Sequence, residues 1–293
     1  MTGIPAPGAH GGDGVAIARA LGIEVLDLSQ SLNPFAPDPG PLVARHASAV
    51  GAYPHPAEAT ALLAETIGVD PARVLLTNGG SEAIDLVARE LGGGVASEPE
   101  FSLHPRGAGP AWRSDPHNPT GHLAADTDAV DVWDEAFFPV ATGRWHGHRP
   151  GVAVGSLTKL FACPGLRIGY VIADDVARFA RHQPQWSVNS IALAALPDLL
   201  ATVDLAGWAS AIASARTALH DHLTDRGFVV EAADAPWVLV KSPDLRDRLA
   251  SRGIAVRDCA SFGLPDWHRI AVPNGAGLGR LLRALDADEA DVR

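Results

Sequence analysis

The chain has 293 residues, 47% hydrophobic and 19% charged, which is long enough for a large core and two domains. Its 23 Lys and Arg against 34 Asp and Glu give a formal net charge of −11, which argues against a nucleic-acid partner. Two cysteines, Cys163 and Cys259, are too few for a disulfide framework or a four-ligand zinc site. With no apolar run of membrane-spanning length and no signal-peptide pattern in residues 1–14, we expect a cytoplasmic protein without membrane partners.

Hydrophobic patterning predicts alternating strands and helices through the first two thirds of the chain. We expect strands at residues 24–29, 73–77, 94–97, 111–114, 129–133, 152–155 and 167–173, and helices at 14–21, 57–67 and 83–91. This alternation is typical of a mostly parallel sheet covered by helices on both faces.

The last third of the chain predicts a smaller α+β unit with short antiparallel strands. Residues 190–223 read as largely helical, and the remaining elements are strands at 228–232, 237–241, 254–257 and 268–272 and helices at 245–251 and 277–285. We therefore expect a large domain of residues 50–199, and a small domain formed by residues 1–49 and 200–293.

Polar residues follow the expected strands at their carboxyl ends, where ligands bind in open α/β sheets. After the strand that ends at Thr77, the run Asn-Gly-Gly-Ser-Glu leads into a helix. Gly80, Ser81 and Glu82 are candidates to hold a phosphate at that helix N-terminus. Taken alone, the same residues equally fit an ordinary helix cap.

Two further strand ends carry candidate side chains. Asp134 ends an apolar strand, where its carboxylate could pair with a ring nitrogen or simply face water. Asn118 lies in the turn-rich loop Asp115–Gly121, between rigid neighbours, as a positioned hydrogen-bonding group or as part of a plain turn.

Lys159 is the candidate nucleophile. It follows the next strand, close to the hydroxyls of Ser156 and Thr158, and Arg167 lies eight residues further on. Burial and a neighbouring cation lower the pKa of a lysine, which imine chemistry requires. The alternative is a surface lysine beside a capping serine.

The ordered motifs NGGSEA, PHNPTG, WDEAF, SLTK and PGLRIGY together resemble fold-type-I enzymes that use pyridoxal 5'-phosphate (PLP), in the class I and II aminotransferase superfamily. The resemblance covers nearly the whole chain. It implies that Lys159 forms the Schiff base to PLP and moves protons. It also implies that Asp134 pairs with the pyridine nitrogen and Asn118 bonds the phenolic oxygen.

The same resemblance implies a phosphate site and a homodimer. The residues expected at the cofactor phosphate are Gly80, Ser81, Ser156, Thr158 and Arg167, with Glu82 beside them. Tyr53, in a Tyr-Pro pair, resembles the tyrosine that reaches the phosphate of a neighbouring subunit, so shared active sites are expected.

Within the superfamily, the opening motifs His10-Gly11-Gly12 and LSQSLNP resemble the threonine-phosphate decarboxylases of cobalamin biosynthesis. The resemblance implies decarboxylation of O-phospho-L-threonine to aminopropanol phosphate. Histidinol-phosphate aminotransferases are the nearest alternative, although they usually carry Tyr where Phe137 stands. The residues implied to bind substrate are His10, Asn33, Asn189, Arg257 and Arg269.

The chain departs from the family pattern after His104. Only Pro105–Pro110 precede the next strand, where relatives have a helix, a strand and another helix, so we expect six strands and a missing edge strand. His104 stands where relatives carry the Tyr that stacks on the cofactor ring, and Pro273 replaces an Arg of the decarboxylases. These departures leave a further alternative: a protein that binds PLP or a phospho-metabolite with little turnover.

Overall fold

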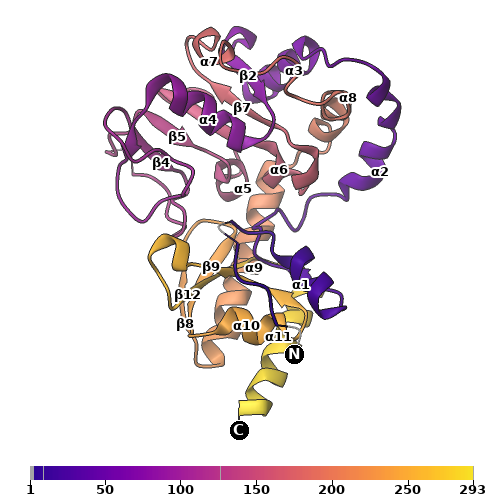
Figure 1. The fold of residues 1–293 in the computed structure, drawn as a ribbon, viewed down its shortest axis with the longest axis vertical. Helices are drawn as coiled ribbons and strands as arrows, with labels where there is room; N and C mark the ends of the chain where they lie inside the picture. Colours follow the sequence, from indigo (N-terminus) through magenta and orange to yellow (C-terminus); the bar gives the residue numbers. More distant parts are fainter. Residues whose placement is uncertain (1–2, 9, 126, 293) are drawn as a thin grey trace.

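Six strands form the sheet at the centre of the larger part of the molecule, which lies at the top of Figure 1. The computed structural model describes residues 3–8, 10–125 and 127–292. The strands are β2 (Val74–Thr77), β3 (Gly94–Val95), β4 (Ala111–Ser114), β5 (Val132–Asp134), β6 (Val152–Ser156) and β7 (Gly169–Ile172). Their order is β2-β7-β6-β5-β4-β3, and only β7 runs antiparallel to its neighbours. The predicted mostly parallel, six-stranded sheet is confirmed.

The outer edge of β3 is covered by its own connection to β4. Gly94 bridges Arg106 in antiparallel fashion, and the Gly107 N–H donates to the Gly93 carbonyl over 2.7 Å. A Cβ on Gly94 would lie 2.5 Å from the Gly107 carbonyl oxygen, so a glycine is needed for this close approach. The shortened segment thus occupies the edge of the sheet.

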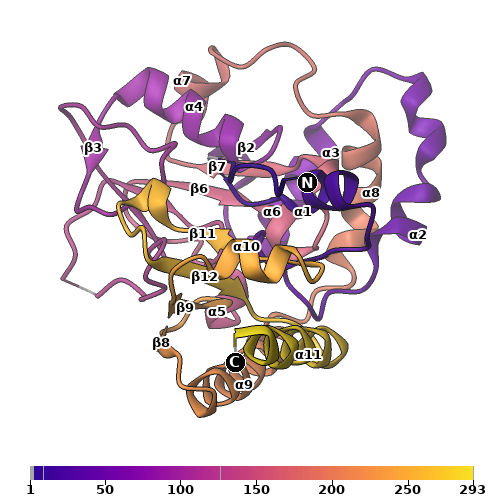
Figure 2. The ribbon, with the colours of Figure 1, turned by 60° about the horizontal axis from the view of Figure 1, so that its bottom comes forward.

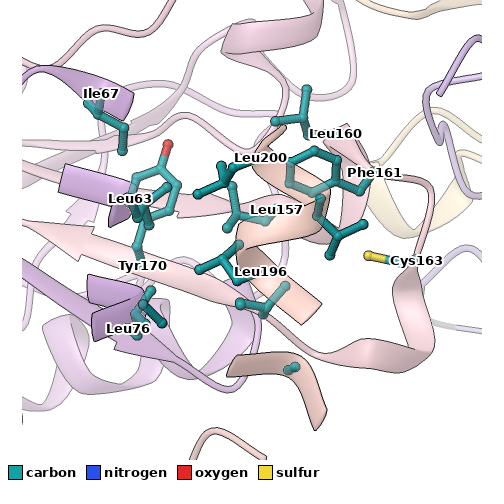
Figure 3. Packing of buried hydrophobic residues seen from close by; sticks show 14 of the residues in the cluster. Leu63, Ile67, Leu76, Leu157, Leu160, Phe161, Cys163, Tyr170, Leu196 and Leu200 are labelled. Carbon is teal, nitrogen blue, oxygen red and sulfur yellow. The ribbon is translucent and has the colours of Figure 1, made fainter. Parts of the chain in front are cut away.

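Helices cover both faces of the six-stranded sheet (Figure 1). On one face, Leu63, Leu196 and Phe161 pack with Tyr170 of β7 in a large apolar core (Figure 3). On the other face, Ile84 packs in a second core with strand residues of the sheet. The helices are α3 (Ala57–Ile67), α4 (Gly80–Leu91), α5 (Phe138–Thr142), α6 (Leu157–Leu160), α7 (Ala177–Ala180) and α8 (Ser190–Leu200), with α2 (Pro39–Ala44) beside α8.

The smaller part is built on a four-stranded antiparallel sheet of order β11-β12-β9-β8. Its strands are β8 (Val229–Ala232), β9 (Trp237–Lys241), β11 (Arg257–Asp258) and β12 (Trp267–Ala271). Helices α9 (Leu205–Asp225) and α11 (Gly275–Val292) lie side by side in Figure 2 and share an apolar core with β9 and β12. Helix α10 (Leu245–Ala250) belongs to the same core.

The N-terminal segment joins the smaller part. Helix α1 (Gly14–Leu21) precedes β1 (Leu26–Asp27), which pairs in parallel with β10 (Ile254–Ala255). The expected strand 254–257 is therefore divided: β10 pairs with β1, and β11 pairs with β12. Val256 between them is fully buried, so the chain changes sheets without leaving the core.

Helix ends differ from expectation where backbone geometry decides them. Helix α4 begins at Gly80 rather than at residue 83, because Gly79 takes a positive φ of 78° that turns the chain directly into the helix. The helical stretch 190–223 is two helices, α8 and α9. In the described part of the chain no single helix is both long and apolar enough to cross a bilayer; only α8 and α9 together meet that criterion, with a bend of 86°.

We retain the division into residues 50–199 and residues 1–49 with 200–293 as a proposal. The proposed boundary at residues 199–200 lies just before α9, the helix that leads from the larger part down to the smaller one in Figure 1.

Candidate active site

A cavity of about 240 Å³ opens where β4, β5 and β6 end, facing the N-terminal arm and the smaller part. Ser114, Asp134 and Ser156, the last residues of these three strands, all line it. Eleven residues singled out in the sequence meet there: His10, Gly80, Ser81, Asn118, Asp134, Ser156, Thr158, Lys159, Arg167, Arg257 and Arg269.

The amine of Lys159 is buried in this cavity. Lys159 stands on the short helix α6, directly after β6, and its Nζ donates a hydrogen bond to the Gln30 carbonyl over 3.0 Å. Burial, with the nearby cations Arg269 and Arg167, lowers the pKa of Lys159 to about 8. A substantial share of the amine is therefore neutral near physiological pH and can act as a nucleophile.

The start of α4 and the side chain of Arg167 form an anion site. The 12-residue helix begins at Gly80, and its N-cap, Gly79, has no side chain that could satisfy the first N–H groups. A Cβ on Gly79 would overlap the Arg167 guanidinium, so only glycine lets the arginine lie against this turn. The Ser156 and Thr158 hydroxyls, 2.7 Å apart, stand on the adjoining element. These groups can together hold a phosphate.

Asp134 is fixed at the base of the cavity. Its Oδ1 accepts from the Ala136 N–H over 3.0 Å, and its Oδ2 lies 3.0 Å from Nε2 of His104. A carboxylate held in this way can face a ring nitrogen and stabilise a proton on it.

His104 does not lie on the cavity wall, which corrects the expectation that it stacks on a cofactor ring. Its side chain is fully buried and lies behind Asp134, with its ring centroid 5.5 Å from that of Trp112. Phe101 and Leu103 line the cavity instead. Phe101, three residues earlier in the same loop, is the aromatic side chain beside His10, with ring centroids 5.6 Å apart.

Glu82 is also corrected, since it is not a lining residue. Its carboxylate accepts the Asn78 N–H over 2.7 Å and takes further bonds from Gln183 and Ser187, so it fastens the turn before α4 rather than facing an anion. Its negative charge would itself disfavour a phosphate.

Two asparagines expected to bind substrate are used in local structure. Asn33 is buried, donates to the Leu160 carbonyl and accepts the Phe35 N–H, each over 3.0 Å. Asn189 caps α8 by accepting the Ala192 N–H. Neither lines the cavity, so the structure does not support a direct contact with substrate.

Tyr53 lies outside the cavity on the surface. Its side chain is 70% exposed and its ring centroid is 4.6 Å from that of Trp186, which is also exposed. Its expected reach into a neighbouring subunit stays a prediction.

Two arginines bring positive charge from the smaller part. Arg269 of β12 donates to Oδ1 of Asn118 over 2.6 Å, and its guanidinium lies 4.6 Å from the Trp237 ring centroid. Burial, together with Arg257, lowers the pKa of Arg269 to about 10, and its buried Nε has no hydrogen-bond partner in the described chain. Arg257 of β11 donates to the Gly8 carbonyl over 2.8 Å. Both side chains can bind anionic groups of a substrate.

Ser29 and Gln30 also line the cavity, although the sequence did not single them out as site residues. Asp27 accepts hydrogen bonds from Gly14, Ser29 and Gln30, which orders this turn, and the Ser29 hydroxyl accepts the Gly12 N–H over 2.7 Å. Gln30 meets Lys159 through a backbone carbonyl, which no residue type reveals. Phe101 could have been found as the aromatic residue of the same motif that contains His104.

Known proteins resemble this chain over most of its length. Residues 114–285, more than half of the chain, match the family model "Aminotransferase class I and II". A histidinol-phosphate aminotransferase of Dechloromonas aromatica is 27% identical over 92% of this chain and 92% of its own length, and relatives from Methylococcus capsulatus and Halobacterium salinarum carry the same name.

Solved structures share the fold. Histidinol-phosphate aminotransferase from Sinorhizobium meliloti, solved with pyridoxal 5'-phosphate, superposes with a TM-score of 0.80 at 19% identity, covering 96% of this chain and 95% of that one. L-threonine-O-3-phosphate decarboxylase from Porphyromonas gingivalis gives 0.73 at 21% identity, covering 89% and 98%.

Proposed function

Since this chain belongs to the class I and II aminotransferase family and is a PLP-dependent enzyme, we propose that it transfers the amino group of a small phosphorylated amine of the histidinol-phosphate type. The observation that carries the proposal is the meeting of Lys159, Asp134, Arg167 and Arg269 in one cavity. Membership of this enzyme family argues against the alternative of a binding protein with little turnover.

The residues that line the cavity fit both ends of PLP, its phosphate and its pyridine ring. The glycine turn before α4, Ser156, Thr158 and Arg167 suit the phosphate, and Asp134 suits the pyridine nitrogen. We propose that Asn118, held by Arg269, bonds the phenolic oxygen. When bound, the cofactor supplies an electron sink for the bonds at the substrate α-carbon.

Lys159 is proposed to carry the covalent attachment and the proton transfers. Its lowered pKa makes the neutral amine available, and the Gln30 carbonyl holds Nζ while the amine is free. Asp134, held by His104 and the Ala136 N–H, would stabilise a proton on the ring nitrogen of the bound cofactor.

Arg257 and Arg269 are proposed to select the substrate. Two guanidinium groups from β11 and β12 line the cavity and offer donors for carboxylate or phosphate. His10 reaches the same cavity from the N-terminal arm. A small substrate with an amine and an anionic group fits this arrangement.

Decarboxylation of O-phospho-L-threonine to aminopropanol phosphate, as in cobalamin biosynthesis, is the second candidate. It is favoured by the His10-Gly11-Gly12 opening, because His10 and Gly11 line the cavity. The curated relatives named above support amino transfer more strongly than this first expectation from the motifs. The two reactions differ in which bond at the substrate α-carbon is broken: the bond to hydrogen in amino transfer and the bond to the carboxylate in decarboxylation.

A homodimer with shared sites is part of the proposal. Tyr53 is exposed and too remote from its own cavity to line it, as a residue serving a neighbouring subunit would be.

The test is to incubate the PLP-loaded enzyme separately with histidinol phosphate and a keto-acid acceptor, and with O-phospho-L-threonine. Carbon dioxide, aminopropanol phosphate and the keto product are measured independently. We expect a keto product from histidinol phosphate and no carbon dioxide. Carbon dioxide from phosphothreonine without a keto product would instead establish the second candidate.

Lys159→Ala serves as the control for both reactions, because it removes the proposed nucleophile. Product formation that survives this change would contradict the assignment of the cavity as the active site.

A further inference from the structure

Residues 98–106, between β3 and β4, have little regular structure of their own but deliver two groups to the active site. Phe101 lines the cavity, and His104 holds Asp134. A segment without a helix or a strand ladder must be fixed by other bonds if its side chains are to keep their places.

One side chain, Arg106, bonds several backbone carbonyls of this segment at once. The guanidinium of Arg106 donates to three backbone carbonyls of the segment: Glu100 over 2.9 Å, Phe101 over 2.8 Å and His104 over 2.6 Å. Its Nε also donates to the Glu98 carboxylate over 3.0 Å. The fixed fork of an arginine matches several acceptors at once, which the single ammonium of a lysine does not.

Arg106 is itself anchored to the sheet. It forms the antiparallel bridge to Gly94 of β3, and the adjoining Gly107 N–H donates to the Gly93 carbonyl. The guanidinium therefore connects the edge of the six-stranded sheet to the turn that carries Phe101 and His104.

We propose that Arg106 is a positioning residue for the cofactor. It holds Phe101 against the cavity and His104 against Asp134, in the segment where the chain is shorter than its family pattern. The carbonyl bonds matter more than the ion pair, because the Arg106 side chain is 37% exposed and that of Glu98 is 58% exposed. The proposal rests on PLP dependence and not on the identity of the substrate.

The experiment compares Arg106→Ala and Arg106→Lys with Glu98→Gln, which weakens the ion pair but keeps the guanidinium and its carbonyl bonds. PLP is titrated into each apo-protein, and unfolding is followed in parallel. We expect the PLP Kd to rise about tenfold in both Arg106 variants, which corresponds to about 1.4 kcal/mol, and less than about twofold in Glu98→Gln. Arg89→Ala, which removes an exposed pair with Asp85 on α4, is the surface control.

A second readout separates positioning from general stability. The pH midpoint of the bound cofactor's absorbance change should move in Arg106→Lys, and the movement should vanish in a His104→Ala background, because the effect of Arg106 on Asp134 passes through His104. If Arg106→Ala does not fold, the PLP Kd and pH midpoint of Arg106→Lys alone test the proposal. An unchanged PLP Kd and pH midpoint in Arg106→Lys, or an equal loss in Glu98→Gln, would overturn the proposal.

Discussion

The two sides of the cavity are ordered in different ways. At the phosphate side, β2 leads directly into α4 and β6 into α6, so the backbone itself sets Gly80, Ser156 and Lys159 in place. On the opposite side, the turns of the N-terminal arm and residues 98–106 are irregular, and they are fixed by hydrogen bonds that the Asp27 carboxylate accepts and Arg106 donates. A site can thus combine one wall made of secondary structure with another fixed by a few polar side chains.

The largest effect is expected at Lys159, where the two sides meet. Lys159→Ala should lower turnover by roughly 10³-fold or more, because both nucleophile and proton carrier are lost. The chain has one other lysine, Lys241, at the exposed end of β9. Borohydride reduction followed by peptide mass spectrometry should therefore find the cofactor on Lys159, and Lys241→Ala should retain full activity. Attachment at Lys241 would refute the assignment.

Gly79→Ala tests the wall made of secondary structure. The new Cβ would displace Arg167, and the alanine would be held at a positive φ that L residues rarely adopt. We therefore expect the PLP Kd to rise roughly 100-fold. Gly68→Ala is a control for a positive φ alone: Gly68 has φ 84° and ψ 36°, against φ 78° and ψ 170° at Gly79, and an added Cβ at Gly68 meets nothing within 4 Å. This control should lose about 1 kcal/mol of unfolding free energy and leave the Kd unchanged. Equal losses of affinity would mean that strain alone was measured.

Phe101→Ala tests the irregular wall. Removing the aromatic ring that faces the cavity should weaken PLP binding about tenfold or less, since aromatic contacts contribute about 0.5–1.5 kcal/mol beyond buried area. Phe101→Tyr should bind PLP nearly as well as the parent, measured by the same titration. A Phe101→Ala enzyme with parental affinity would show that this wall does not contact the cofactor.

The smallest effect concerns pH. The rate of PLP capture by the apo-protein should rise with pH through about 8 and then level off, because the neutral Lys159 amine reacts. Arg269 helps to keep the pKa of Lys159 low, so Arg269→Met should raise that pKa and move the midpoint of the rate profile to higher pH. Stopped-flow absorbance measures the profile, and a midpoint that stays or falls would contradict the charge coupling.

The sequence was sufficient where strand ends decide the site. Asp134, Ser156 and Lys159 could be brought together in advance, because the carboxyl ends of parallel strands share one edge of a sheet. The absence of a seventh strand also followed from the short connection after His104.

The sequence was insufficient where local hydrogen bonds compete for the same side chains. Glu82, Asn33 and Asn189 have the right chemistry for a ligand but are used in turns and caps, which residue type alone does not reveal. Phe101, and not His104 as expected, lines the cavity. Which side chain of this loop faces the cavity is set by tertiary contacts such as those of Arg106, which the sequence does not reveal.

The covering of β3 by residues 106–108 has a consequence for solubility. A free strand edge is a template for pairing with another chain, and here the protecting residues continue directly from residues 98–106, which carry Phe101 and His104. Release of this segment would expose the edge at the same time as it loosens the cofactor. Self-association and cofactor loss should therefore rise together, and saturating PLP should suppress both.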